Sequence, residues 1–157
     1  MNTQVVLITG ELTGIGRATA LAFAKEGAQV VVSGRRDEEG QQLVSEIRKA
    51  GAEAEFIRAD VRHEEDVRNL IDKTVERFGR LDVAVNTAGT EGVPGPITEQ
   101  TADRYAATFD TNVLGTLLSM KHELRVMLPQ KNGCIGRSPS TNGVGFSCAK
   151  GALDQRV

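Results

Sequence analysis

Residues 5–16 read VVLITGELTGIG, and this stretch decides the fold of the chain. It begins with an apolar, β-branched run, which is typical of a strand buried on both faces of a parallel sheet. Gly10, Gly14 and Gly16 follow, and residues 14–26 then carry apolar side chains at helical spacing. Glycines in such a turn let backbone N–H groups approach a phosphate at the helix N-terminus. The turn predicts a phosphate-binding loop, with a purely conformational role for the glycines as the alternative.

The same alternation of strand and helix continues along the whole chain. Further strands are predicted at residues 29–33, 53–59, 82–86 and 133–137, and helices at 38–50, 64–78 and 101–128, with another possible helix beginning at 147. Buried strands alternating with helices indicate an α/β fold, a doubly wound Rossmann-type parallel sheet in three αβα layers. We therefore expect residues 1–157 to form one dinucleotide-binding domain.

The doubly wound sheet has the strand order 3-2-1-4-5-6, and only five strands are predicted here. The fifth strand would then be an apolar edge, which exposes unpaired backbone groups to association. We expect a sheet that is incomplete at its C-terminal side. Either a partner covers the edge or the chain is a fragment.

Composition and charge exclude several classes of protein. The chain has 19 Lys and Arg against 21 Asp and Glu, a net charge of −2, which argues against nucleic acid as a partner. No apolar run is long enough to span a membrane, and the N-terminus does not resemble a signal peptide. Cys134 and Cys148 fit neither a Cys-x-x-Cys motif nor a disulfide framework, so a reducing, cytoplasmic setting is expected. The two histidines lack metal-ligand spacing, and no metal site is predicted.

The glycine turn has the pattern Gly-x-x-x-Gly-x-Gly and is followed by four further motifs in a characteristic order. They are Asp60-Val61, Asn86-Thr87-Ala88-Gly89, Asn112 within a long helix, and the segment Ser147-Cys148-Ala149-Lys150-Gly151-Ala152-Leu153. Together these motifs resemble the short-chain dehydrogenase/reductase family over essentially all of the chain. The resemblance implies hydride transfer between a nicotinamide cofactor and a small-molecule carbonyl or alcohol substrate, whose identity the sequence does not reveal.

The cofactor expected from charge is NADP(H) rather than NAD(H). Arg35 and Arg36 follow the second strand where an NAD-binding fold carries an acidic residue, and guanidinium groups pair well with a 2′-phosphate. A solvated turn is the alternative interpretation of the two arginines. Together with the resemblance, this predicts cofactor contacts at Gly10, Thr13, Gly14, Ile15, Gly16, Arg17, Arg35, Arg36, Asp60, Val61, Asn86, Ala88, Gly89 and Lys150.

The catalytic residues implied by the resemblance are only partly present. Asn112, Ser140 and Lys150 match the family positions, but Phe146 stands four residues before the lysine, where the family has its tyrosine. General acid–base catalysis typically contributes about 10²–10⁴-fold, so impaired activity is expected.

Two other interpretations remain open. One is a non-catalytic dinucleotide-binding or dimerisation module derived from the family. The other is a truncated or frameshifted gene product that folds poorly. Whether the chain is an enzyme or a module, the apolar residues of the 112–128 helix predict a homo-oligomer.

Overall fold

The structure, a computed structural model, describes residues 3–10 and 12–137. Across these residues five strands form one sheet in which all neighbours are parallel, in the order β3-β2-β1-β4-β5. The strands are β1 (Val5–Thr9), β2 (Gln29–Gly34), β3 (Ala54–Arg58), β4 (Val83–Asn86) and β5 (Cys134–Arg137). This confirms the predicted doubly wound parallel sheet.

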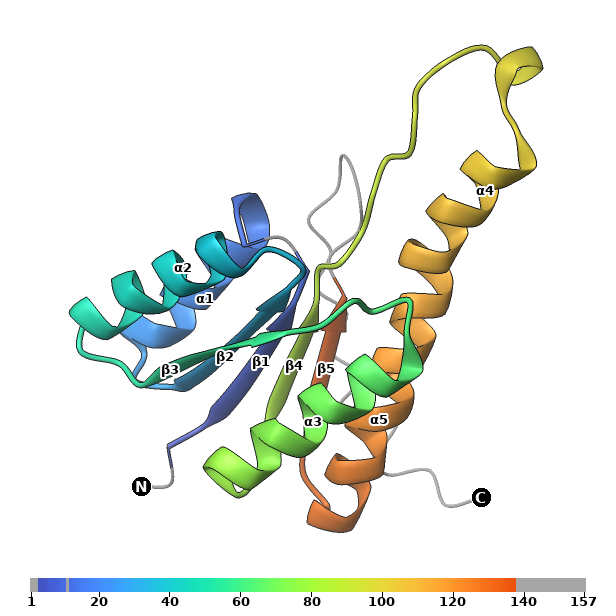
Figure 1. The fold of residues 1–157 in the computed structure, drawn as a ribbon. Helices are drawn as coiled ribbons and strands as arrows, with labels where there is room; N and C mark the ends of the chain where they lie inside the picture. The colour runs from blue at the N-terminus through green and yellow to red at the C-terminus, as the bar shows by residue number, and fades with distance from the viewer. Residues whose placement is uncertain (1–2, 11, 138–157) are drawn as a thin grey trace.

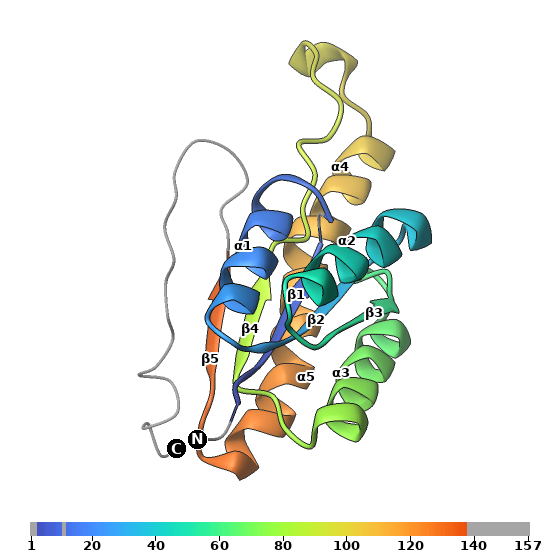
Figure 2. The same cartoon turned by 90° about the vertical axis from the view of Figure 1, so that its left-hand side faces the viewer.

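Helices cover both faces of the sheet (Figures 1 and 2). α1 (Gly14–Lys25) and α2 (Asp37–Lys49) lie on one face, and α3 (Glu64–Phe78) and α5 (Gly115–Gln130) lie on the other. Successive strand residues alternate between the layers: Val6 and Ile8 pack in the cluster with α1 and α2, whereas Leu7 packs in the cluster with α3 and α5. Burial on both faces explains why β1 is apolar without alternation.

The predicted helix 101–128 is the element that differs most from the sequence interpretation. It consists of α4 (Ala102–Phe109), a π-helical turn (Asp110–Leu114) and α5, preceded by a short 3-10 helix (Ile97–Glu99). The helical segment also ends later than predicted, at Gln130, whose side chain bonds both the N–H and the C=O of Leu81. Figure 1 shows α4 extending beyond the carboxyl ends of the strands.

Cys134, the first residue of β5, is disulfide-bonded. The expectation of reduced cysteines is therefore wrong for this residue, because sequence spacing does not report which residues the fold brings together. Cys148 lies outside the described residues. Within the described part of the chain, no helix combines the length and the apolar character that crossing a membrane requires.

Candidate functional site

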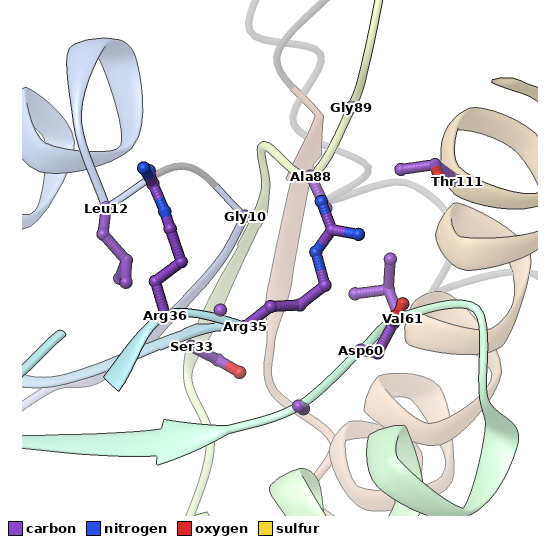
Figure 3. Close-up of a pocket in the computed structure, with 12 residues that line it drawn as sticks. Gly10, Leu12, Ser33, Arg35, Arg36, Asp60, Val61, Ala88, Gly89 and Thr111 are labelled. Atoms are coloured by element: carbon purple, nitrogen blue, oxygen red, sulfur yellow. The ribbon is translucent and has the colours of Figure 1, made fainter. Parts of the chain in front are cut away.

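A cavity of about 180 Å³ opens at the carboxyl ends of the central strands. In a doubly wound sheet this is where ligands bind. Figure 3 shows the side chains that converge on it. The cavity is lined by Gly10, Leu12, Ser33, Gly34, Arg35, Arg36, Ala59, Asp60, Val61, Ala88, Gly89 and Thr111.

The turn between β1 and α1 reaches the cavity because Gly10 packs directly on the end of β4. Gly10 has a φ of 111°, and a Cβ built on it would lie 2.2 Å from the backbone nitrogen of Ala88. Its N–H donates to the carbonyl oxygen of Ser33 at 2.9 Å, which ties the turn to β2 as well. Only a residue without a side chain allows this approach. The glycine at this position is therefore required by the fold itself.

The N-terminus of α1 follows this turn. Gly14 has a φ of 52°, Gly16 is buried, and Thr13 and Ile15 are exposed. The Thr13 side chain makes no capping hydrogen bond, and the first turn of α1 holds no acidic residue. The partial positive charge of the helix end is thus left uncompensated by its own side chains, which favours an anion there.

The predicted arginines do not all reach the cavity. Arg35 and Arg36 line it, and Figure 3 shows the Arg35 side chain running across it toward Ala88. Arg36 also pairs with Glu39 at 3.0 Å. Arg17 instead pairs with Glu46 of α2 at 2.5 Å and is not among the lining residues.

Asp60 lines the cavity with its carboxylate held by a neighbour. Arg62 Nε donates to Asp60 Oδ1 at 3.0 Å, and Arg62 Nη2 donates to Asp60 Oδ2 at 2.6 Å. This hydrogen-bonded guanidinium lowers the pKa of Asp60 to about 2, with a smaller contribution from the charge of Arg35. Asp60 is therefore ionised at any physiological pH. Val61, the next residue, gives the cavity an apolar wall.

Asn86 ends β4 below the cavity, and Ala88 and Gly89 line it. The Asn86 side chain is buried beneath the strand ends. It accepts a hydrogen bond from Thr9 Oγ1 at 2.9 Å and donates one from Nδ2 to Glu123 Oε2 at 3.0 Å. Asn86 thus holds the strand ends rather than facing the cavity.

Asn112 lies in the π-helical turn and fixes the loop after β4. Its Oδ1 accepts from Thr90 N at 2.8 Å, and its Nδ2 donates to Thr90 O at 2.8 Å. Both hydrogen-bonding groups of its amide are therefore used to hold the loop. The backbone oxygen of Asn112 accepts hydrogen bonds from Thr116 Oγ1 at 2.8 Å and from Arg137 Nη2 at 3.4 Å. Ser140, Phe146 and Lys150 lie outside the described residues.

Sequence reasoning missed several residues of this region. The cavity is also lined by residues that were not predicted as cofactor contacts, namely Leu12, Ser33, Gly34, Ala59 and Thr111. Glu123 is fully buried on α5, and burial raises its pKa to about 7. A signal for Glu123 did exist: it stands four residues from both Ser119 and Met127, which share the buried face of α5.

A family model described as short chain dehydrogenase matches residues 4–155 of the chain. Xanthoxin dehydrogenase from Arabidopsis thaliana is 41% identical over 144 residues, which cover 90% of this chain and 50% of that protein. The chain spans about half the length of the curated relatives it matches.

Solved structures share the fold closely. An actinorhodin polyketide ketoreductase variant crystallised with NADPH is 33% identical with a TM-score of 0.85, covering 96% of this chain and 59% of its own. The NADH-dependent reductase A1-R′, complexed with NAD, is 26% identical with a TM-score of 0.82, covering 92% of this chain and 64% of its own.

Proposed function

The chain belongs to the short-chain dehydrogenase/reductase family, and on that premise we propose that its cavity binds the adenosine half of NADP(H). The bound cofactor would supply the hydride donor or acceptor for a small carbonyl or alcohol substrate. Residues 1–157 would act as one dinucleotide-binding domain.

The residues present fit an adenosine phosphate. Leu12, Val61 and Ala88 offer apolar surface for the ring, and Asp60 offers a fixed acceptor. The uncapped N-terminus of α1 suits the pyrophosphate. The cavity volume of about 180 Å³ is below the roughly 300–1,000 Å³ of whole-ligand pockets, so it suits one part of a dinucleotide.

The preference for NADP(H) rests on the charges after β2. Arg35 and Arg36 line the cavity, whereas the nearest following carboxylate, Asp37, is paired with Arg58 at 3.0 Å and is not among the lining residues. The Arg58 guanidinium therefore compensates the charge of that carboxylate, which reduces its repulsion of a 2′-phosphate. The related structures were crystallised with either NADPH or NAD, so the arginines carry this proposal.

Titration of the full chain with NADPH and with NADH tests the cofactor site. NADPH should bind more tightly, and Arg35→Ser should weaken NADPH binding about 10- to 100-fold while leaving NADH binding nearly unchanged. Arg68→Ser is the matched control, because Arg68 is an exposed α3 arginine that is not among the lining residues. Equal affinities for the two cofactors would contradict the proposed 2′-phosphate contact.

The catalytic part of the proposal assigns Asn112, Ser140 and Lys150 to the reaction, with activity impaired by Phe146. The alternative is a module that binds the cofactor without turnover, favoured by the missing phenol hydroxyl. Phe146→Tyr should raise NADPH-dependent carbonyl reduction by about 10²-fold or more if only the proton donor is missing. If the unaltered chain reduced the carbonyl as fast as Phe146→Tyr does, this result would contradict the proposed impairment.

We also propose self-association through the helical segment that contains residues 112–128. Its exposed apolar side chains include Val113, Leu114 and Leu117, and the preceding helix α4 carries the exposed, stacked rings of Tyr105 and Phe109. Leu118 and Leu124 belong instead to the core clusters of this face. Sedimentation of the full chain, with Leu117→Lys as the disrupting variant, tests this proposal.

A further inference from the structure

A chain of three buried polar side chains lies beneath the cavity and crosses two layers of the fold. Thr9 Oγ1 donates to Asn86 Oδ1 at 2.9 Å, and Asn86 Nδ2 donates to Glu123 Oε2 at 3.0 Å. The side chains are 2%, 3% and 0% exposed, respectively. We call these three residues the Glu123 network. It connects the carboxyl ends of β1 and β4 to α5.

The Glu123 network includes the last residues of β1 and β4, the strand ends that lead into the cavity wall. Thr9 and Asn86 are register partners in the parallel pair β1–β4. The next residue after Thr9 is Gly10, and Ala88 follows Asn86 by two positions; both line the cavity. A shift of the Asn86 side chain would therefore move two walls of the cavity together.

Glu123 is held in this network without a charged partner. Its Oε1 has no hydrogen-bond partner among the described residues. Burial raises the pKa of Glu123 to about 7, although the bond from Asn86 acts in the opposite direction. Charged residues of α3 form ion pairs with neighbours of Glu123 on α5: Glu64 pairs with Lys121 and His122, and Asp72 pairs with Arg125. From β4, the neutral Asn86 side chain bonds Glu123, and Asn86 in turn bonds the neutral Thr9 of β1.

We propose that Glu123 is a positioning residue for the dinucleotide site, setting the Asn86 side chain and, through it, the ends of β1 and β4. The inference rests on the cofactor binding proposed above. The neutral carboxyl group is compatible with the buried interface between α5 and β4, whereas a carboxylate there lacks a compensating charge. Ionisation of Glu123 would draw water into the interface between α5 and β4 and disturb the ends of β1 and β4. The affinity for the cofactor should therefore fall as the pH rises.

The test compares the unaltered chain with Glu123→Gln, which keeps the shape and stays neutral. NADPH dissociation constants are measured for both from pH 6 to pH 8. At each pH, the dissociation constant of the unaltered chain is divided by that of Glu123→Gln, so that the titration of the 2′-phosphate, which affects both proteins equally, cancels. This ratio should be near 1 at pH 6 and should rise to about 10 at pH 8. Glu65→Gln, a change at an exposed glutamate of α3, should keep the unaltered profile.

A second variant separates positioning from simple loss of stability. Glu123→Met stays neutral but leaves Asn86 Nδ2 without an acceptor, so it should weaken NADPH binding at every pH. We therefore expect Glu123→Gln to keep the NADPH affinity and Glu123→Met to lose it. Equal pH profiles for the unaltered chain and Glu123→Gln would overturn the proposal.

The third measurement uses the chain without cofactor, so that a failure of the proposed cofactor binding can be distinguished from a failure of the role proposed for Glu123. The NMR signals of the Asn86 side-chain NH₂ and of the Gly10 and Gly89 amides should titrate together near neutral pH. The same signals should be unresponsive in Glu123→Gln. If NADPH fails to bind either protein, the proposed function is wrong, and these signals alone decide the role of Glu123. Absence of the titration would overturn that role.

Discussion

Replacing Gly10 by alanine should be among the most damaging single changes in the chain. The glycine brings the β1–α1 turn against the end of β4, and a Cβ there would lie 2.2 Å from Ala88 N. Ordinary contact begins at 3.4 Å, so the two backbones would have to separate by about 1.2 Å. Gly27→Ala is the matched control, because Gly27 also has a positive φ, 83°, but nothing lies within 4 Å of its Cβ position.

The expected difference follows from the bonds that such a separation would break. The Thr9 carbonyl oxygen accepts from Thr87 N at 2.9 Å and from Thr87 Oγ1 at 2.6 Å, and Gly10 N donates to Ser33 O. Each bond contributes about 1 kcal/mol, and backbone strain adds about 1–3 kcal/mol. We expect Gly10→Ala to lower the free energy of unfolding by about 4–6 kcal/mol, and Gly27→Ala by about 1–2 kcal/mol.

Urea unfolding of both variants, followed by circular dichroism, measures these free energies. NADPH titration of the same samples measures binding, which Gly10→Ala should abolish and Gly27→Ala should retain. Similar losses of stability in the two variants would refute the close approach of the turn to β4.

Two further predictions concern the polar groups around the cavity. The raised pKa of Glu123 means that the folded chain binds a proton that the unfolded chain has released between about pH 4.5 and 7. The free energy of unfolding should therefore fall as the pH rises through this range, by about 3 kcal/mol in all, and Glu123→Gln should remove this component when urea unfolding is repeated across the range. Asn112→Ala should remove both bonds to Thr90 and speed amide hydrogen exchange at Thr90, with Asn112→Asp intermediate because a carboxylate keeps only the acceptor. Unchanged exchange at Thr90 would show that the side chain of Asn112 does not hold the loop.

The order of the elements was predictable because its signals are local. Apolar β-branched runs mark the buried strands, and right-handed crossovers then restrict the sheet order. More than half of the cavity residues at the turn and after β2, β3 and β4 were predicted for the same reason: Gly10, Arg35, Arg36, Asp60, Val61, Ala88 and Gly89. They lie at strand ends that a parallel sheet must bring to one edge.

The features that the sequence did not reveal depend on contacts between distant residues. The π-helical turn leaves no mark in apolar spacing, although it contains Asn112, which bonds Thr90 22 positions away. Arg17 was assigned to the cofactor from its place beside the glycine turn, yet the packing of α1 on α2 pairs it with Glu46. Glu123 would be expected on a surface by residue type, and its buried partner Asn86 is 37 residues away.

The most direct measurement of the central claim uses only the part of the cofactor that the cavity should hold. Calorimetric titration of the full chain with adenosine 2′,5′-bisphosphate and with adenosine 5′-monophosphate compares two ligands that differ by the 2′-phosphate. We predict that the bisphosphate binds at least tenfold more tightly and that Arg35→Ser removes this difference. Equal binding of both ligands would contradict the role of the arginines, and binding of neither would contradict the site itself.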